Sequence, residues 1–451
     1  MMSLAIAADA LKGTLHGNDA VFTGVSTDTR NLQPGDLFVA LQGPNFDGHN
    51  FIAEAIAAGA AGALFSRAVT TPLSHILVSD TRRGLGELAS FWRMQFTIPL
   101  IAITGSNGKT TVKEMTAAIL AQRGRVCVTQ GNFNNDIGMP LTLLRLRKSH
   151  HYAVIEMGMN HKGELNYLSR LGQPTVAVLN NAAPAHLAGL GTVEDVARAK
   201  GEIFLGLAID GIGILNADDM YFEMWREMVK PRRIVTFGLD KPADVRADYT
   251  LEHGGSKLRL QTPQGKIDAH LSLLGRHNVM NALAATAAAL SAGAGIDDVP
   301  PALAKIKPVP GRLEMKPGIS GACVIDDTYN ANPSSIAAGL HVLKEFDGER
   351  VFVMGDMAEL GEQTPAQHDK IGELARSLGI HRLYGFGQNA QRAVNTFGRG
   401  ARHFAVPEAL IEALQDCMHA EMTLLIKGSR VMRMERIVKG IVRQANEEKI
   451  A

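Results

Sequence analysis

Gly105-Ser106-Asn107-Gly108-Lys109-Thr110-Thr111 is a glycine-rich turn between two regular elements. The apolar run at residues 99–103 before it predicts a strand, and the pattern at residues 112–122 after it predicts a helix. A strand, a glycine-rich turn and a helix in this order form a phosphate cradle, because backbone N–H groups point inward and the helix N-terminus adds positive potential. Lys109 then reaches the β- and γ-phosphates, and the Thr110 hydroxyl ligates Mg²⁺. The stretch therefore predicts a nucleoside triphosphate site.

The spacing of this turn departs from the common phosphate-loop pattern. That pattern has glycine at the position where this chain has Ile103. The simpler alternative is an ordinary turn that happens to precede a lysine. The strand before it and the helix after it favour the phosphate loop.

Composition limits the classes of function. The chain has 451 residues, 46% of them apolar, and a net charge of +1, so no overall field draws it to nucleic acid or to anionic lipid. Its three cysteines lie far apart and form neither a metal spacing nor a disulfide framework. Residues 1–9 do not resemble a signal peptide, and no apolar run is long enough to span a membrane. We therefore expect a cytoplasmic protein without stable membrane insertion.

The rhythm of apolar runs divides the chain into three predicted domains. Residues 1–82 alternate short strands with a helix and predict a small α/β domain. Residues 83–311 alternate buried strands with helices and predict a doubly wound, mostly parallel sheet, followed by an antiparallel stretch at 249–274. After a proline-rich junction, residues 312–451 resume the alternation and predict a second, Rossmann-like α/β domain.

Two predicted strands end on residues that can ligate a metal. Glu156 ends the strand at residues 152–157, and His186 follows the strand end at Asn180-Asn181. Ligands of open α/β sheets bind outside the carboxyl ends of the strands, which places Glu156 well for Mg²⁺. A glutamate in a salt bridge and a structural histidine are the ordinary alternatives, and spacing alone favours the structural histidine.

Lys200 interrupts an apolar stripe. Val196, Lys200 and Phe204 are spaced i, i+4 and i+8 on a helix predicted at residues 192–207, so they share one face. A lysine there either extends its amine out of the stripe or keeps a desolvated amine with a lowered pKa. A neutral amine can add CO₂ and form a carbamate. From the pattern alone, the unmodified lysine is the simpler interpretation.

Amide-rich segments mark further ligand candidates. The loop at residues 131–138 contains Asn132, Asn134 and Asn135, which suit either a polar substrate or tight turns. Asn278 and Asn281 share a face at the start of a predicted helix. The segments at 326–333 and 427–430 follow predicted strands, where ligands bind.

Together these motifs resemble the Mur ligase family of ATP-dependent amide-bond ligases, over essentially the whole chain and in the family's order. The resemblance also rests on Ser26-Thr27-Asp28-Thr29-Arg30 and on Val353-Met354-Gly355-Asp356-Met357-Ala358-Glu359-Leu360-Gly361. The family's phosphate loop has the same shortened spacing. The resemblance implies a UDP-sugar domain, a central ATPase domain and a C-terminal Rossmann-like domain.

The resemblance also implies roles for single residues. It makes Thr110, Glu156, His186 and a carbamylated Lys200 metal-site residues, with Lys109 on the phosphates. The implied nucleotide contacts are Gly105, Asn107, Gly108, Lys109, Thr110, Thr111, Asn278, Asn281, Arg312, Asp327, Tyr329 and Asn330. The implied substrate contacts are Ser26, Thr27, Asp28, Arg30, Asn45, Phe46 and Asp47 for the uridine, Asn132, Asn134 and Asn135 for the muramoyl-peptide, and Lys427 or Arg430 for the acceptor.

The implied reaction uses ATP and Mg²⁺. It adds D-Ala-D-Ala to UDP-N-acetylmuramoyl-tripeptide through an acyl phosphate, in the synthesis of the peptidoglycan precursor. Because an acyl phosphate hydrolyses when water reaches it, domain closure is expected before chemistry. A monomer is expected.

Two alternatives remain. One is a sister ligase that adds a diamino acid to UDP-N-acetylmuramoyl-dipeptide, which the absence of an Asp-Asn-Pro-Arg run disfavours. The other is a regulatory GTPase-like switch, which the absence of an Asn-Lys-x-Asp motif disfavours.

Overall fold

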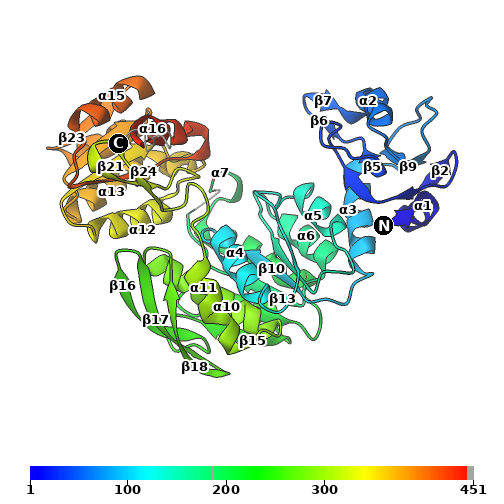
Figure 1. Ribbon diagram of the computed structural model, residues 1–451, viewed down its shortest axis with the longest axis horizontal. Helices are drawn as coiled ribbons and strands as arrows, with labels where there is room; N and C mark the ends of the chain where they lie inside the picture. The colour runs from blue at the N-terminus through cyan, green and yellow to red at the C-terminus, as the bar shows by residue number, and fades with distance from the viewer. Residues whose placement is uncertain (185–186, 444–451) are drawn as a thin grey trace, which may run out of the picture.

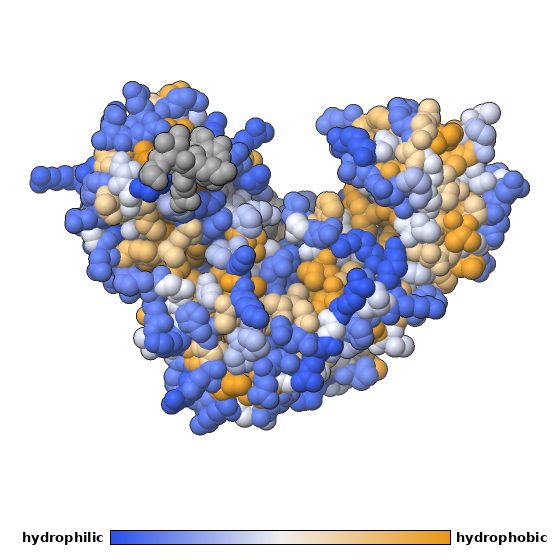
Figure 2. All heavy atoms as spheres, viewed as in Figure 1, coloured by the Kyte–Doolittle hydropathy of each residue, from blue (hydrophilic) through white to orange (hydrophobic). Residues whose placement is uncertain are grey.

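The computed structural model describes residues 1–184 and 187–443. Figure 1 shows three α/β parts in chain order: the N-terminal and C-terminal parts form two arms that rise from the central part. The space-filling view in Figure 2 shows an open notch between these arms, with hydrophilic residues on both sides of it. The expected mixed α/β fold with parallel sheets is confirmed.

The central part contains a six-stranded sheet in which every neighbouring pair is parallel. Its order is β11 (Val126–Val128), β12 (Tyr152–Glu156), β10 (Leu100–Thr104), β13 (Val176–Leu179), β14 (Ile212–Asn216) and β15 (Arg233–Phe237). The helices around it are α4 (Lys109–Leu120), α5 (Gly138–Leu144), α6 (Glu164–Gly172), α7 (Leu187–Leu190), α8 (Val193–Gly201), α9 (Phe222–Val229), α10 (Arg276–Ser291) and α11 (Val299–Lys305).

Both faces of this sheet are buried, which explains its continuous apolar strands. In β10, Leu100 and Ala102 face one core and Ile101 and Ile103 face the other, because successive side chains of a strand alternate. The buried Ile103 thus belongs to the strand and not to the phosphate loop.

The N-terminal arm contains a five-stranded mixed sheet. Its order is β2 (Thr14–His16), β9 (His75–Leu77), β8 (Gly62–Phe65), β5 (Asp36–Val39) and β4 (Gly24–Ser26). Two small ribbons pair β1 (Met2–Ser3) with β3 (Val21–Phe22) and β6 (Gln42–Gly43) with β7 (Phe46–Asp47), and the helices are α1 (Leu4–Leu11) and α2 (Ile52–Ala57).

Helix α3 (Thr81–Arg93) joins this arm to the central part. Its buried residues belong to one continuous core that includes residues of both parts. Gly84 leaves room for Leu64 of β8, and Gly86 leaves room for Tyr167 and Leu171 of α6, since a Cβ at either glycine meets those side chains. The helix is thus packed on two sides.

The C-terminal arm contains another six-stranded sheet, parallel except for its first pair. Its order is β19 (Glu314–Pro317), β20 (Cys323–Asp326), β24 (Met422–Lys427), β21 (Glu349–Gly355), β22 (Arg382–Phe386) and β23 (Ala401–Phe404). Its helices are α12 (Pro333–Lys344), α13 (Thr364–Ser377), α14 (Ala390–Phe397), α15 (Pro407–Cys417) and α16 (Glu435–Ile441).

Two further expectations can be compared with the structure. The antiparallel stretch is present as β16 (Arg246–Glu252), β17 (Gly255–Thr262) and β18 (Gly265–Leu271). The helix predicted at 192–207 ends at Gly201 and continues as a 3₁₀ turn, where the Glu202 carboxylate accepts backbone N–H bonds from Gly163 and Asn166. The predicted boundary at 82/83 lies inside α3, and the three domain ranges stay predictions. No helix in the described part of the chain is long and apolar enough to cross a membrane.

Candidate active site

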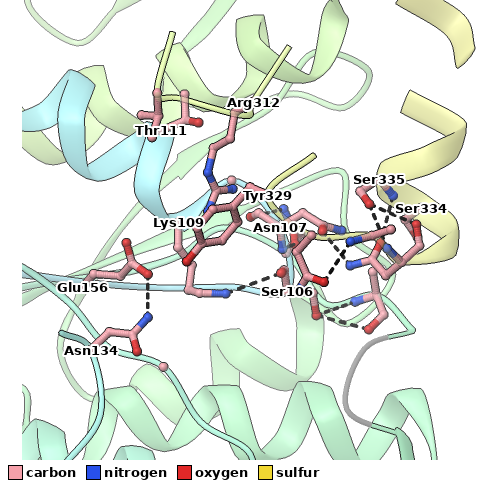
Figure 3. A pocket seen from close by; sticks show the side chains of 18 of the residues that line it. Ser106, Asn107, Lys109, Thr111, Asn134, Glu156, Arg312, Tyr329, Ser334 and Ser335 are labelled. Atoms are coloured by element: carbon pink, nitrogen blue, oxygen red, sulfur yellow. Dashed lines mark hydrogen bonds between the residues drawn. The ribbon is translucent and has the colours of Figure 1, made fainter. Parts of the chain in front are cut away.

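The central and C-terminal parts face each other across a cleft of about 940 Å³. The phosphate loop, the start of α10 and the end of β12 line its central side, and segments 327–335 and 427–431 line the other side. Figure 3 shows Lys109, Glu156, Arg312 and Tyr329 converging in this cleft. The sequence-predicted loops at strand ends therefore meet in one place.

Hydrogen bonds within the protein fix the shape of the phosphate loop. The Lys109 ammonium donates to the backbone oxygens of Gly105 at 2.7 Å and Ser106 at 3.4 Å. The Asn107 N–H donates to Oδ1 of Asn181 at 2.8 Å. Burial lowers the pKa of Lys109, although the nearby Glu156 carboxylate opposes the shift. A phosphate in the loop would provide an anionic partner for this buried ammonium.

Gly108 is required by its surroundings. Its φ is +80°, and an added Cβ would lie 2.3 Å from Oδ1 of Asn281 and 2.6 Å from Nδ2 of Asn180. Neither the conformation nor the space accepts a side chain. The loop therefore packs closely against α10, which brings the start of that helix to the nucleotide site.

Glu156 is nearly fully buried at 3% exposure and accepts two hydrogen bonds. The Thr110 hydroxyl donates to its Oε2 at 2.9 Å, and Nδ2 of Asn134 donates to its Oε1 at 2.7 Å. Its own N–H donates to the Thr129 hydroxyl at 3.0 Å, which fixes the end of β12. A buried hydroxyl and carboxylate in contact are oxygen ligands of the kind that Mg²⁺ prefers, so this pair fits the expected metal.

Lys200 is buried, so its amine does not extend out of the apolar stripe as the simpler of the two alternatives expected. Lys200 is 1% exposed on α8, and Val196 and Phe204, four residues before and after it, are fully buried. Desolvation, and then the positive charge of Lys109, lower the pKa of Lys200 well below its usual value. Its amine therefore lies close to the phosphate-loop lysine. The other predicted metal ligand, His186, lies outside the described residues, and within them no group of three or more His, Cys, Asp or Glu side chains gathers as a metal site.

The amides of α10 form a chain that ends at the phosphate loop. Asn278 donates to the Leu274 carbonyl at 2.8 Å and accepts from Nδ2 of Asn281 at 3.0 Å. Oδ1 of Asn281 accepts from Asn180 at 2.9 Å, and Asn180 also donates to the Asn107 carbonyl at 3.0 Å. Asn278 and Asn281 line the cleft as predicted, and they also fix the shape of the loop.

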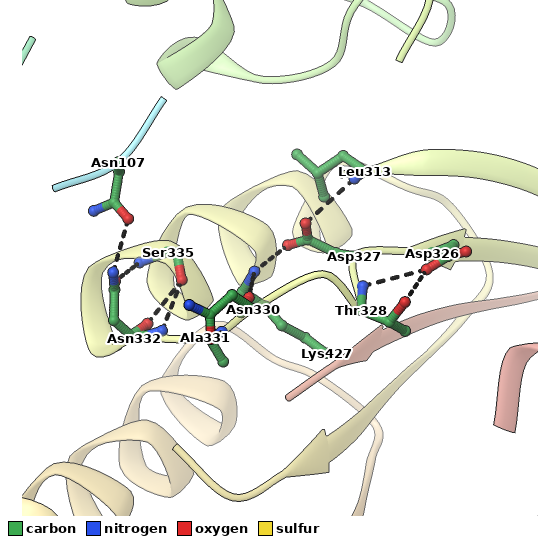
Figure 4. A network of polar contacts seen from close by, with 10 residues as sticks. All are labelled: Asn107, Leu313, Asp326, Asp327, Thr328, Asn330, Ala331, Asn332, Ser335 and Lys427. Carbon is green, nitrogen blue, oxygen red and sulfur yellow. Dashed lines mark hydrogen bonds and ion pairs between the residues drawn. The ribbon is translucent and has the colours of Figure 1, made fainter. Parts of the chain in front are cut away.

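The C-terminal arm contacts the phosphate loop directly. Nη2 of Arg312 donates to the Thr110 hydroxyl at 3.1 Å, and its guanidinium lies 4.3 Å from the centre of the Tyr329 ring. Nδ2 of Asn332 donates to Oδ1 of Asn107 at 2.8 Å, as Figure 4 shows. Asn332 also caps α12, so the helix start and the loop share one amide.

The two predicted acceptor cations differ in their surroundings. Lys427 is 3% exposed, and its ammonium lies 2.6 Å from the Asp327 carboxylate and donates to the Asn330 carbonyl at 3.0 Å (Figure 4). The side chain of Arg430 is 63% exposed at the rim of the cleft, with Glu435 at 3.3 Å. The carboxylate of Asp327, predicted as a ribose contact, accepts hydrogen bonds from the Lys427 ammonium and from the N–H of Leu313, the latter at 3.3 Å.

The predicted uridine residues lie in the N-terminal arm and do not line this cleft. Hydrogen bonds from Arg30 hold the pKa of Asp28 below its usual value, and the Ser26 hydroxyl donates to the Asp28 carbonyl at 2.9 Å. Asp47 accepts from His49 at 2.6 Å and from Arg67 at 3.1 Å. These carboxylates thus stabilise their own loops. Asn132 also lies outside the cleft lining, unlike Asn134 and Asn135.

Among the cleft residues to which sequence reasoning gave no individual role are Arg82, Asn181 and Asn332. Asn332 precedes Pro333, a pairing typical of a helix start, which could have singled it out as a cap. Nothing in the sequence connects it to Asn107, 225 residues away.

Comparison with known families covers most of the chain. Residues 21–93 match the Mur ligase family catalytic domain, residues 103–289 the Mur ligase middle domain, and residues 311–430 the Mur ligase glutamate ligase domain. The chain belongs to the Mur ligase family. The resemblance inferred from the motifs is confirmed, and the three matches follow the order of the three parts of the structure.

Individual relatives within the Mur ligase family are similar over nearly their full length. The UDP-N-acetylmuramoyl-tripeptide–D-alanyl-D-alanine ligase of Escherichia coli (strain K12) is 44% identical over 98% of each chain. The UDP-N-acetylmuramoylalanyl-D-glutamyl-2,6-diaminopimelate–D-alanyl-D-alanyl ligase from Acinetobacter baumannii superposes with a TM-score of 0.88 at 35% identity, covering 97% of each chain. The MurF ligase from Thermotoga maritima in complex with ADP superposes with a TM-score of 0.83 at 28% identity, covering 92% of this chain and 96% of that one.

Proposed function

We propose that this Mur ligase joins D-Ala-D-Ala to UDP-N-acetylmuramoyl-tripeptide with hydrolysis of ATP to ADP, in peptidoglycan precursor synthesis. The observation that carries the proposal is the full-length similarity to the Escherichia coli ligase of that name, combined with a cleft where a phosphate loop faces a second α/β domain. A relative crystallised with ADP supports the nucleotide.

The residues of the cleft divide the work. Lys109 binds the γ-phosphate when it leaves the Gly105 carbonyl, and Arg312, already beside Thr110, faces the same phosphate from the other domain. We assign Asn278 and Asn281 to the adenine and Asp327, Tyr329 and Asn330 to the ribose, since all five line the cleft. Thr110 and Glu156 would hold Mg²⁺, which would offset the negative charge of the phosphates.

The chemistry follows from this placement. The terminal carboxylate of the tripeptide attacks the γ-phosphorus, and ADP leaves, which yields an acyl phosphate. The neutral amine of D-Ala-D-Ala attacks the acyl carbon, phosphate leaves with the C–O bond electrons, and the attacking nitrogen loses one of its two protons as the amide forms. Lys109 and Arg312 neutralise charge on the transferred group, and the C-terminal arm excludes water.

Lys200 is the candidate for a carbamate. Its buried amine, made neutral by desolvation and by Lys109, adds to CO₂; an N–C bond forms and one proton leaves. The product is an anion, which would attract the nearby Lys109 ammonium. With Glu156 and His186 it would complete the metal site of the family.

Chemical rescue tests the carbamate. Lys200→Ala should lose nearly all turnover, and a small carboxylate such as acetate should restore part of it, with chloride at equal ionic strength as the control. High-resolution density that shows an unmodified amine with both metals and ATP bound would refute the carbamate.

The acceptor contacts are assigned by charge. D-Ala-D-Ala has one C-terminal carboxylate and two methyl side chains. Arg430 at the rim suits the carboxylate better than Lys427, because Asp327 already balances Lys427. Val431, 75% exposed in the same segment, offers apolar surface for a methyl group.

The remaining parts of the proposal concern the whole molecule. We assign the uridine to the N-terminal arm, at Ser26, Thr27, Asp28 and Arg30 and at Asn45, Phe46 and Asp47. The muramoyl-peptide then runs past Asn132, Asn134 and Asn135 to the phosphate loop. We propose domains at 1–82, 83–311 and 312–451, a monomer, and a cytoplasmic location.

One assay tests the function. With ATP, Mg²⁺ and UDP-N-acetylmuramoyl-tripeptide, ADP should form in proportion to added D-Ala-D-Ala. A free diamino acid should not replace the dipeptide, because its extra charge would be desolvated without a partner. Turnover with UDP-N-acetylmuramoyl-dipeptide and a diamino acid would instead identify the sister ligase.

A further inference from the structure

An arginine and an aspartate face each other on the wall of the cleft nearest the N-terminal arm. Arg82 lies in the first turn of α3, and Asp136 lies in the amide-rich loop at 131–138. Nη2 of Arg82 donates to Oδ1 of Asp136 at 2.7 Å, and Nε donates to the other carboxylate oxygen. Both residues line the cleft.

This pairing has the geometry of carboxylate recognition. Two parallel N–H donors of one guanidinium engage both oxygens of one carboxylate, which is how arginine binds carboxylate ligands. The side chains are 56% and 30% exposed, so water reaches the pair. An ion pair this exposed contributes at most about 1 kcal/mol to stability, so little opposes the exchange of one carboxylate for another.

The location matches the path of a peptide. Asp136 is two residues from Asn134, which donates to Glu156 at the reaction end of the cleft. Two extended residues span at most about 7 Å. The Arg82 guanidinium, paired with Asp136, therefore lies about one or two peptide residues from the site where the donor carboxylate reacts.

Arg82 also differs from Lys162 and Arg276, and it is far more exposed than the paired Lys427. Lys162 and Arg276 pair with Asp195 and Asp240, which do not line the cleft. The partner of Arg82 is itself a cleft residue, so a ligand carboxylate in the cleft meets the pair directly.

We propose that Arg82 binds a non-reacting carboxylate of the donor peptide, and that Asp136 holds the guanidinium in position until that carboxylate displaces it. The inference rests on the proposed function. Such a carboxylate has two sources in the donor named for the Acinetobacter baumannii relative: the glutamyl residue, or the second carboxylate of 2,6-diaminopimelate as the third residue.

Two substitutions with opposite expected signs test this. Arg82→Ala should raise the KM for the UDP-tripeptide about 10- to 100-fold, the value of a charge-assisted contact, with kcat less affected. Asp136→Asn removes the internal competitor and should lower that KM by up to about fivefold. Arg83→Ala is the matched control: Arg83 is adjacent, 74% exposed, paired with Glu87, and outside the cleft lining, so its KM should not change.

The choice of donor identifies the source of the carboxylate. If Arg82→Ala raises the KM only for a donor ending in 2,6-diaminopimelate and not for one ending in lysine, Arg82 binds the third residue. If the KM rises equally for both, it binds the glutamyl carboxylate. An unchanged KM for Arg82→Ala would overturn the proposal. So would an equal rise in KM for Arg82→Ala and Asp136→Asn, because a purely structural ion pair is lost in the same way in both variants. Failure of the proposed function is distinct: the unsubstituted enzyme would then form no amide with either donor.

Discussion

The central domain meets its two neighbours through junctions of opposite character. At the N-terminal junction, Leu85, Leu88 and Ala89 of α3 are fully buried in a core that continues into both parts. At the C-terminal junction, the phosphate loop meets Asn332 and Arg312 through hydrogen bonds, and Leu274 is the buried apolar residue that the central part adds to the core of the C-terminal arm.

This difference indicates which part moves. Separating an apolar interface exposes surface that nothing else covers, at about 25 cal/mol per Å². Separating a polar interface exchanges its hydrogen bonds for bonds to water or ligand, at a net cost of about 1 kcal/mol each. We infer that α3 keeps the N-terminal arm anchored and that the C-terminal arm opens and closes over the nucleotide.

Lys109→Ala has the largest expected effect. It should remove activity at the polar junction while both domain interfaces stay intact. Activity should fall by about a hundred- to a thousandfold, as for loss of a preorganised group that stabilises transition-state charge. The melting temperature should change little, because the Lys109 side chain faces the cleft, where water can replace its hydrogen bonds to the loop carbonyls. Steady-state kinetics and calorimetry measure both, and activity within threefold of the parent would contradict the phosphate-loop assignment.

Leu88→Ala breaks the apolar junction. The fully buried leucine leaves a cavity, so the free energy of unfolding should fall by about 2–5 kcal/mol. Because α3 belongs to both parts, the N-terminal and central domains should both melt at lower temperature. Differential scanning calorimetry with ATP absent tests this, and a shift confined to one transition would show that the core is not continuous.

Asn332→Ala weakens the polar junction. It removes one amide contact to the phosphate loop and the cap of α12, so the KM for ATP should rise about tenfold while the melting temperature changes by only a few degrees. Ser334→Ala, in the same helix turn and without the contact to Asn107, is the control.

Small-angle scattering adds the conformational readout. The unsubstituted enzyme should become more compact with ATP and UDP-tripeptide, and Asn332→Ala should compact less at equal ligand concentration. An unchanged radius of gyration for the unsubstituted enzyme with every substrate present would contradict closure by the C-terminal arm.

A pH effect sharpens the comparison further, since a titratable side chain lies at the polar junction. Burial, and then the charge of Lys427 across the junction, lower the pKa of His277 to about 4. The unfolded chain binds a proton below about pH 6.5, so the stability from this neutral ring is complete above that pH and is lost as the pH falls toward 4.

His277→Gln should therefore flatten the decline in unfolding free energy between pH 7 and pH 5 by about 2 kcal/mol. Urea unfolding at several pH values measures the difference. Parallel curves for the two proteins would exclude a neutral His277 in the folded state.

Local sequence predicted the parts of the site that depend on local structure. The order of strand, turn and helix gave the phosphate loop, and helical spacing placed Lys200 on the apolar face of its helix, although the pattern alone favoured an amine that extends out of that face. The contacts between distant segments were beyond sequence reasoning: Arg82 and Asp136 are 54 residues apart, and Lys427 and Asp327 are 100 residues apart. Spacing placed Lys427 at a strand end, but only the assembled sheet shows that a carboxylate already balances it.

The hydrogen bond from the Lys109 ammonium to the Gly105 carbonyl has a consequence for product release. When ADP and phosphate leave, the ammonium can donate a hydrogen bond to the Gly105 carbonyl oxygen, at 2.7 Å, in place of a phosphate oxygen. Arg82 with Asp136 and Thr110 with Glu156 follow the same arrangement. We therefore expect an oxygen of the chain to take the place of each departing oxygen, so that the products dissociate by substitution.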